Sequence, residues 1–265
     1  MKSILLLFWG LLLTLSAFSQ RGLFVNDSAG GIRVMPSTFI YIDGDFQLLK
    51  TFPNPINKLI NGEIYITNDL VTNDSLYCDK QDSVAGVKPS KIHFVGSTDS
   101  HIRGTQIPQL YQLIVNKTAG NLYIDNTISV LDTIQFIGGN AIIDTNIQVK
   151  LKYRTGTTYI DSKPYLYGEN ALHRFLGEGI LYTKFSIADS HDISVANTGF
   201  YFHGHQSDTL ELKRGHKKLL YAGNGSVDRY FDVKFTGTTS AFHDTVSVKY
   251  LGDEDYSLIG VDTNN

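Results

Sequence analysis

Apolar residues alternate with polar ones in short runs along most of this 265-residue chain, and this period-two pattern is the feature that most constrains its fold. Successive side chains of a β-strand point to opposite faces, so such a run builds a strand with one buried face. The runs are bounded by Gly, Asn, Asp and Thr, and the clearest are GEIYITNDL (62–70), KIHFVG (91–96), FDVKF (231–235) and TVSVKYL (245–251). Helical periodicity is hard to find beyond the first 19 residues, so an all-β fold is predicted.

Between Leu113 and Leu151 the alternation becomes regular. Apolar pairs begin about six or seven residues apart, at Leu122, Ile128, Ile134, Ala141 and Ile147. Asp or Asn stands between the pairs, at Asp125-Asn126, Asp132, Asn140, Asp144 and Asn146. A short strand followed by a tight polar corner repeats at this spacing, so we predict a β-solenoid, parallel β-helix-like, in which each turn buries its inward side chains against the next. An ordinary β-meander with short hairpins is the open alternative.

The residue types at these corners have a physical reason. Asn and Asp tolerate a positive φ and hydrogen-bond to their own backbone, and glycine adopts such a φ without a side-chain penalty. Further corner candidates are Gly62 and the pairs Gly30-Gly31 and Gly138-Gly139. The Asp residues could instead bind Ca²⁺, but the sequence contains neither an EF-hand loop nor a Gly-Gly-x-Gly-x-Asp array.

The composition changes near residues 150–190. Gly168, Gly177 and Gly179 interrupt the pattern there, and Glu169 to Leu176 is predicted to form one short helical turn. Longer strands with hairpin-like connections follow from about residue 190, which favours a small β-sandwich-like domain. The predicted organisation is a signal peptide over 1–19, a β-solenoid-like domain over 20–165, a joint over 166–189 and a β-sandwich-like domain over 190–265.

The N-terminus has the layout of a secretory signal peptide. Lys2 gives a short positive region, Ile4 to Leu15 is almost wholly apolar, and Ala17-Phe18-Ser19 offers the small residues that a signal peptidase reads. This apolar run is too short to span a bilayer, which takes about 20 helical residues. An uncleaved membrane anchor is the alternative. No later stretch is apolar enough to be a transmembrane segment after signal cleavage.

Four segments resemble parts of secreted proteins of Bacteroidetes-type bacteria. They are LFVNDSAGGIRVMPSTFIYIDGDFQ with NGEIYITNDL (23–47 and 61–70), KIHFVG to AIIDT (91–145), YLYGENALHRFLGEGILYTK (165–184) and LELKRGHKKLLYAGNGSVDRYFDVKF (210–235). The resemblance implies the repetitive β part of a cell-surface protein of the kind associated with gliding motility or type IX secretion. Such proteins usually end in a C-terminal sorting domain, and we expect none in this sequence, which ends soon after the last of the four segments. The expected location is the cell surface or extracellular space, with the periplasm as the alternative.

The sequence indicates a non-enzymatic protein. It has no Gly-x-Ser-x-Gly elbow and no phosphate-binding Gly loop ahead of a helix. Its net charge of −3 argues against nucleic-acid binding. We therefore predict an exported structural or adhesive cell-surface module without catalytic, cofactor-binding or metal-binding residues, whose partners are a cell-surface glycan or other envelope proteins. The alternative is a polysaccharide-binding or polysaccharide-cleaving β-helix protein.

The alternative function needs paired carboxylates on one lateral face. Asp43, Asp45, Asp69 and Asp74 are candidates by residue type, although YIDGDF reads equally well as a Gly-centred turn. The lone Cys78 is expected to be a half-buried strand residue, not a nucleophile, and one Cys allows no internal disulfide.

Histidine and basic residues gather in the C-terminal third. His203 and His205 flank one glycine, so both rings could face one metal ion. His216 and His243 lie nearby in sequence. A polar strand end is the simpler interpretation of the two histidines. The basic run Lys213 to Lys218 is predicted to be a solvated hairpin tip, with contact to an anionic glycan or lipid headgroup as the alternative. Arg214, His216 and Arg229 are expected to pair with Asp228 or Asp232 in a structural role.

The signal peptide gives the first testable prediction. Cleavage after Ser19 leaves Gln20 as the mature N-terminus, so N-terminal sequencing of exported protein is expected to start at Gln20 or within a few residues of it. Protein that retains Met1 in the membrane fraction would contradict signal cleavage and support the uncleaved anchor.

Overall fold

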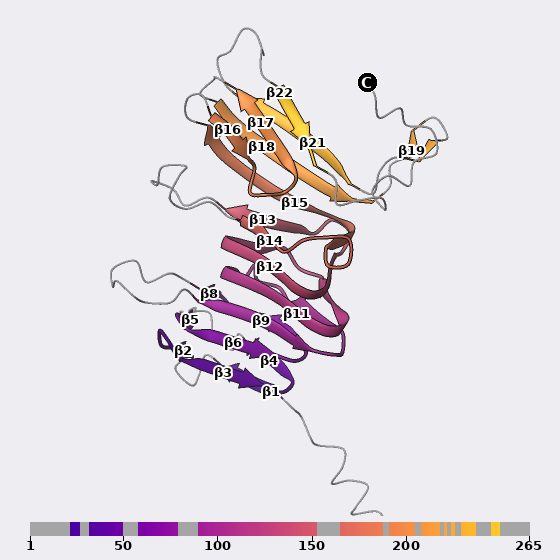
Figure 1. Ribbon diagram of the computed structural model, residues 1–265. Helices are drawn as coiled ribbons and strands as arrows, with labels where there is room; N and C mark the ends of the chain where they lie inside the picture. The colour runs from indigo at the N-terminus through magenta and orange to yellow at the C-terminus, as the bar shows by residue number, and fades with distance from the viewer. Residues whose placement is uncertain are drawn as a thin grey trace, which may run out of the picture.

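A computed structural model describes residues 22–26, 32–49, 58–78, 90–152, 165–187, 191–204, 208–217, 220–221, 224–225, 229–236 and 245–249. These residues form strands β1 to β22 and no helix, so the predicted all-β fold is confirmed for this part of the chain. The strands make one 17-stranded sheet that is mostly parallel, a 3-stranded sheet and a 2-stranded sheet (Figure 1). No helix in the described ranges is long and apolar enough to cross a membrane.

Strands of the first part pair in three rows, always in parallel with the strand three positions further along the chain. The first row is β1 (Gly22–Asn26), β4 (Asp45–Leu49), β7 (Leu70–Thr72) and β10 (Ser100–Arg103). The second row is β2 (Arg33–Val34), β5 (Lys58–Ile60) and β8 (Leu76–Cys78). The third row is β3 (Phe39–Ile42), β6 (Glu63–Ile66) and β9 (Lys91–Gly96).

The next two strands are longer, and each of them runs through all three rows without interruption. Strand β11 (Gln109–Ile124) pairs in turn with β8, β9 and β10. Strand β12 (Ile128–Ile143) pairs in parallel with β11 and then with β13 (Gln148–Lys152), β14 (Tyr165–Tyr167) and β15 (Phe175–Ile187). Because β11, β12 and β13 pair in parallel, the hairpin meander considered for residues 113–151 is wrong.

The parallel strands place their inward side chains in columns. We use the word turn for one passage of the chain through the three rows. In the third row one residue of each turn lies beside one residue of the next, and all five members of this column are 0% exposed: Ile64, Ile92, Leu113, Ile134 and Leu166. They belong to one hydrophobic core whose members run from Val34 to Ala196 in the sequence. Burying an aliphatic side chain of this size contributes about 1.5–3 kcal/mol, so the stacked columns are the main source of stability.

Corner side chains connect each turn to the next by hydrogen bonds. An Asp or Asn oxygen accepts a hydrogen bond from a backbone N–H of the following turn at Asp45 (Asp69 N, 3.2 Å), Asp69 (His101 N, 2.9 Å), Asp99 (Asn121 N, 2.8 Å) and Asn140 (Arg174 N, 3.2 Å). Asn146 has the positive φ of 65° expected of a corner, and Gly139 has a φ of 76°. Asp132 and Asn140, also predicted at corners, lie within β12 where its pairing shifts from one partner strand to another.

One corner contains a buried cation. Lys117 is 2% exposed, and its Nζ donates to the carbonyl oxygens of Thr67 (3.3 Å) and Val95 (2.8 Å) and to Ser100 Oγ (2.8 Å). Burial lowers the pKa of Lys117 below its ordinary value, although the charges of Asp99 and Asp69 oppose this shift. The ammonium thereby connects three successive turns.

The last described part of the chain is antiparallel. Strand β15 pairs with β18 (Asp208–His216), which pairs with β21 (Tyr230–Thr236). The 3-stranded sheet consists of β16 (His191–Ser194), β17 (Phe200–Gly204) and β22 (Thr245–Val248), and the 2-stranded sheet of β19 (Leu220–Tyr221) and β20 (Asn224–Gly225). A second core joins β17 to β18 through Phe200, Phe202, Leu210 and Leu212.

The predicted helical turn at Glu169–Leu176 is wrong. Asn170 Oδ1 accepts hydrogen bonds from the backbone N–H groups of Leu172 (2.8 Å) and His173 (3.1 Å), so these groups are held in a bend and not in a helix. Strand β15 then begins at Phe175. The predicted joint, 166–189, contains most of β14 and all of β15, both paired with β12 in the large sheet. The predicted signal peptide and Gly30-Gly31 lie outside the described residues.

Strand β12 gives a matched test of which side chains point inward. Ile134→Asp places an unpaired charge in the core and is expected to lower the free energy of unfolding by about 4 kcal/mol or more. Ile137, on the same strand, is 52% exposed, so Ile137→Asp is expected to change it by no more than about 0.5 kcal/mol. Urea unfolding followed by circular dichroism measures both. Equal stability of the two variants would contradict the inward assignment of Ile134.

Candidate functional site

Strand β18 carries the most deeply buried charge of the described residues. Its side chains alternate between two faces: Leu210, Leu212, Arg214 and His216 are buried, whereas Lys213 is 39% exposed. Arg214 is 0% exposed. A guanidinium removed from water is tolerated only when a counter-ion and hydrogen-bond acceptors surround it.

Glu169, between β14 and β15, is the counter-ion of Arg214. Arg214 Nη1 and Nη2 donate to the two carboxylate oxygens at 2.8 and 2.6 Å, which is a bidentate pair. Nη1 also donates to Thr198 O (2.8 Å), and Nε donates to His216 Nε2 (3.1 Å). The guanidinium carbon lies 5.9 Å from the centre of the Phe175 ring. Every nitrogen of Arg214 therefore has an acceptor.

The surrounding charges fix two protonation states. Burial alone would raise the pKa of Glu169, but the charge and hydrogen bonds of Arg214, with the charge of Arg229, hold that pKa below its ordinary value. Burial lowers the pKa of His216 well below 6.5, and the positive charges of Arg214 and Arg229 lower it further. His216 is therefore neutral at pH 7, which leaves its Nε2 able to accept the hydrogen bond from Arg214.

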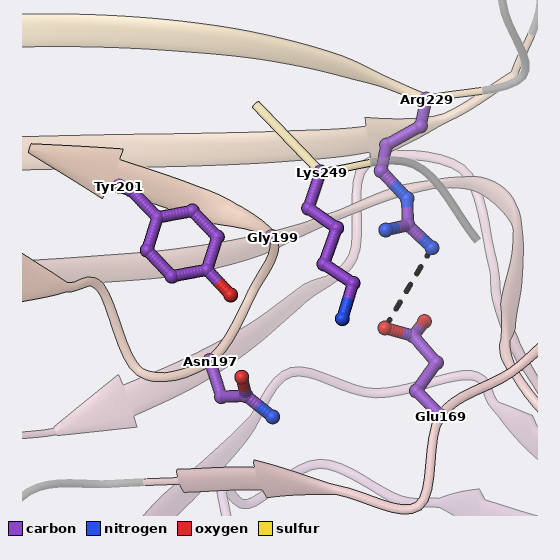
Figure 2. Close-up of a pocket in the computed structure, with 6 residues that line it drawn as sticks. All are labelled: Glu169, Asn197, Gly199, Tyr201, Arg229 and Lys249. Atoms are coloured by element: carbon purple, nitrogen blue, oxygen red, sulfur yellow. Dashed lines mark ion pairs between the residues drawn. The ribbon is translucent and has the colours of Figure 1, made fainter. Parts of the chain in front are cut away.

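A cavity of about 70 Å³ adjoins this ion pair (Figure 2). Its lining residues come from segments far apart in the sequence: Glu169, Asn197, Gly199, Tyr201, Arg229 and Lys249. Arg229 Nη2 lies 3.7 Å from Glu169 Oε2. Figure 2 shows the Lys249 amine and the Tyr201 hydroxyl pointing into the space in front of the Glu169 carboxylate.

The turn before β17 holds one wall of the cavity. Ala196 and Asn197 have φ values of 50° and 53°, and Gly199 has a φ of 90°. Lys249 N donates to Gly199 O (2.7 Å), and a Cβ at Gly199 would lie 2.7 Å from Lys249 O. Asn197 Nδ2 donates to Leu166 O (2.6 Å). Glycine at position 199 thus lets β17 and the end of β22 approach closely enough to bring Lys249 to the cavity.

The outward face of the third row is a second candidate. Tyr65 stacks on His93 with ring centres 4.1 Å apart, and Tyr41 stacks on the other side at 6.5 Å. Glu63 lies beside them: Tyr65 Oη donates to its Oε2 (2.8 Å), and Lys91 Nζ lies 3.6 Å from its Oε1. Tyr165 and Tyr167 on β14 are also exposed in this row. The face therefore presents aromatic rings together with paired charges.

The carboxylates considered for catalysis make hydrogen bonds and ion pairs that support the fold. Asp45 accepts hydrogen bonds from the side chains of Asn68 and Gln47 and from Asp69 N, and Asp43 accepts one from Thr67 Oγ1. Gly44 lies between them in a bend with a φ of 134°, so the Gly-centred turn is the correct interpretation of YIDGDF. Asp43 and Asp45 line one open groove, and Asp69 pairs with Arg103 at 3.0 Å.

Asp74 and Cys78 lie in the interior. Asp74 is 1% exposed and accepts a hydrogen bond from Ser75 N (2.7 Å). Cys78, expected to be half-buried, is 0% exposed and belongs to the core.

No group of three or more His, Cys, Asp or Glu residues within the described ranges is arranged to hold a metal ion. The side chain of His203 and the whole of His205 and His243 lie outside what the structure describes. His216 faces Arg214 and is unavailable to a metal.

The predicted hairpin tip is wrong, because Lys213 to His216 belong to β18 and the alternation of the strand sends Arg214 and His216 inward. The counter-ion of Arg214 is Glu169, which Arg229 also approaches at 3.7 Å, whereas Asp232 pairs with Lys213 at 3.3 Å. Asp228 lies outside the described residues. Glu169 is 45 residues from Arg214, and no local pattern connects the two positions.

Comparison of the chain with protein-family models, curated proteins and solved structures found no match. The functional argument therefore rests on the geometry of this chain.

The buried ion pair predicts a non-additive effect on stability. Arg214→Met leaves Glu169 buried without its main partner and is expected to cost about 3–5 kcal/mol of unfolding free energy. Adding Glu169→Leu removes the unpaired charge, so the double variant is expected to be more stable than Arg214→Met alone. Urea unfolding curves measure the free energies of the single and double variants.

The neighbouring residue supplies the control. Lys213→Met removes a positive charge from the exposed face of the same strand, and its surface ion pair with Asp232 is worth no more than about 1 kcal/mol. If Arg214→Met lowered the free energy of unfolding no more than Lys213→Met, the ion pair of Arg214 with Glu169 would not be needed to hold this part of the protein together.

Proposed function

We propose that this chain is an exported, non-enzymatic structural or adhesive module of a bacterial cell surface, built as a β-solenoid followed by a β-sandwich-like unit. The observation that carries the proposal is the parallel pairing of each early strand with the strand three positions later. Chain that returns to the same row after every three strands winds as a coil, and each turn then buries its apolar side chains against its neighbours.

The C-terminal strands fit the role of a cap. An open edge of a parallel sheet exposes unpaired backbone groups to other chains. Strands β18 and β21 continue beyond β15 in antiparallel pairing, and the second core packs β17 against β18. This arrangement supports a sandwich-like unit that covers the last turn of the solenoid.

The use of the polar residues supports a structural role. Asp45, Asp69 and Asp99 accept hydrogen bonds from the backbone of neighbouring turns. Carboxylates engaged in this way stabilise the corners, and removing one would leave a backbone N–H without its acceptor. A long rigid body with exposed side chains in rows suits repeated weak contacts with a surface partner.

Export and location are part of the proposal. The N-terminal signal peptide and the resemblance to Bacteroidetes-type surface proteins support delivery to the cell surface or the extracellular space, with a role in adhesion or in gliding motility. The proteins that the sequence resembles are associated with gliding motility or type IX secretion. Residence in the periplasm is the alternative.

Polysaccharide binding is the second candidate function, and one observation favours it. The outward face of the third row combines the stacked rings of Tyr41, Tyr65 and His93 with the carboxylate of Glu63. Aromatic side chains supply large contact area, and adjacent polar groups orient a ligand. A glycan bound along this face would make the protein an adhesin.

The test of the non-enzymatic function is a screen of the mature protein against a panel of polysaccharides with detection of new reducing ends. We expect no turnover. A glycan array is probed alongside this screen, and any glycan that binds the parent protein is expected to bind the Tyr65→Ala variant less tightly. Glycan cleavage that disappears in Asp45→Asn, while the circular dichroism spectrum stays unchanged, would overturn the non-enzymatic proposal.

A further inference from the structure

We propose that the outward face of the third row binds a neutral, linear, β-linked polysaccharide that lies across the strands, along the axis of the stack. The ligand class rests on polysaccharide binding, the second candidate function above. The structure adds the direction, the length and the charge of the bound chain. These follow from the register, the exposure and the ion pairs of the outward side chains.

Outward side chains of the third row line up in two ladders that cross the strands. One residue of each of β3, β6, β9, β11, β12 and β14 pairs with one residue of the next strand in each ladder. The first ladder, which we call the track, is Phe39, Glu63, Lys91, Gln112, Thr133 and Tyr165. The second ladder is Tyr41, Tyr65, His93, Ile114, Gln135 and Tyr167. Each ladder therefore has one side chain per turn.

The track reaches solvent at every position, and both of its ends are aromatic. Phe39 is 70% exposed and Tyr165 is 42% exposed, and none of the four residues between them is buried. The ring of Phe39 lies at 86° to that of Tyr65, so it stands apart from the stacked rings of the second ladder. The second ladder is closed at Ile114, which is 2% exposed. The track is thus the ladder that a ligand can follow from end to end.

The spacing of the track matches an extended glycan. Neighbouring strands lie about 4.8 Å apart, so five spacings separate Phe39 from Tyr165 by about 24 Å. One sugar unit of an extended β-linked pyranose chain advances by nearly the same distance as one strand spacing. A chain of about six sugar units therefore places one unit beside each track residue. The pyranose rings at its two ends can pack their C–H faces on Phe39 and Tyr165.

The charges on the face favour a neutral ligand. Lys91 Nζ lies 3.6 Å from Glu63 Oε1, so the two charges of the track compensate each other. Burial lowers the pKa of His93 below its ordinary value, so its ring is mainly neutral at pH 7. Asp132, beside the track, accepts a hydrogen bond from Gln112 Nε2. An anionic polysaccharide would therefore meet two carboxylates and one ammonium along this part of the track, and would be repelled more than attracted.

The middle of the track can bind sugar hydroxyls. The Lys91 ammonium carries three donors, and the Gln112 amide carries two donors and an acceptor oxygen, so each can bind a hydroxyl and keep its neighbour. Tyr65 Oη donates to Glu63 Oε2 at 2.8 Å, which fixes the position of that carboxylate. Because these side chains are held before any ligand arrives, binding requires little reordering of the protein, which favours affinity.

The test is isothermal titration calorimetry of the full mature protein with β-1,4-linked hexasaccharides of glucose, xylose and mannose, and with the disaccharide of each. We expect saturable binding of at least one hexasaccharide, about tenfold or more tighter than its disaccharide, because the longer chain alone spans the track. The β-1,4-linked hexamannuronate differs from the mannose chain by one carboxylate per unit. It is expected to bind about tenfold or more weakly than the neutral chain that binds.

Truncating the ring at either end tests the length of the track. Phe39→Ala and Tyr165→Ala are each expected to weaken hexasaccharide binding by roughly tenfold. Leu172→Ala is the matched control, because Leu172 is 75% exposed in the loop before β15 and belongs to neither ladder. It is expected to bind the hexasaccharide like the parent protein. All three side chains are exposed, so the variants are expected to keep a melting temperature close to that of the parent.

Three results would remove a binding track across the strands. They are no saturable binding of any of the three hexasaccharides, equal affinity for a hexasaccharide and its disaccharide, and a loss of affinity confined to one of the two end variants. Equal binding of hexamannuronate would remove the neutral charge of the ligand. A dimer seen by sedimentation without ligand, and lost in Phe39→Ala, would assign the face to a second copy of this chain.

Failure of the proposed function appears in different measurements. New reducing ends in the polysaccharide screen would overturn the non-enzymatic proposal whether or not the hexasaccharides bind. A branched or charged glycan that binds on the array, while no neutral hexasaccharide binds, would keep polysaccharide binding and remove the assignment to a neutral linear chain.

Discussion

Backbone pairing between successive turns is the constraint on which the rest of this structure depends. A parallel strand hydrogen-bonds on both edges, so every turn must stay in register with the turns before and after it. The buried column from Ile64 to Leu166 sets that register, because a slip of one residue would turn its isoleucines and leucines to the outside and bring polar neighbours inside. The corner carboxylates can reach their N–H donors, and the ammonium of Lys117 its oxygen acceptors, only in the same register.

The register is constant although the length of chain per turn is not. In the third row Glu63 pairs with Lys91, Lys91 with Gln112 and Thr133 with Tyr165, which are separations of 28, 21 and 32 residues. The two longer separations include residues 79–89 and 153–164, which lie outside the described ranges. A fixed sequence period is therefore visible only in the segment of long strands around β11 and β12, and this is the segment where the sequence predicted a regular repeat.

Local chemistry made part of the fold predictable. Period-two alternation identifies strands such as Glu63–Ile66 and the inward position of Ile134, and corner residues such as Asn146 follow from their tolerance of positive φ. Contacts between distant segments were not predictable in the same way. The pairing of Glu169 with Arg214 depends on how β14 and β18 are placed, and the bend made by the Asn170 side chain replaced an expected helical turn. The cavity was not predicted for the same reason, since its six residues come from four separate segments.

Arg214 also determines how the two parts of the protein come apart. Its guanidinium is bound to Glu169, which follows β14 of the parallel rows, and to Thr198 O, which precedes β17 of the 3-stranded sheet. Separating the antiparallel strands from the parallel rows would leave the Glu169 carboxylate without its main counter-ion. The boundary region is thus one cooperative unit in unfolding, because the backbone pairing of β15 with β18 and the ion pair of Arg214 with Glu169 must break together.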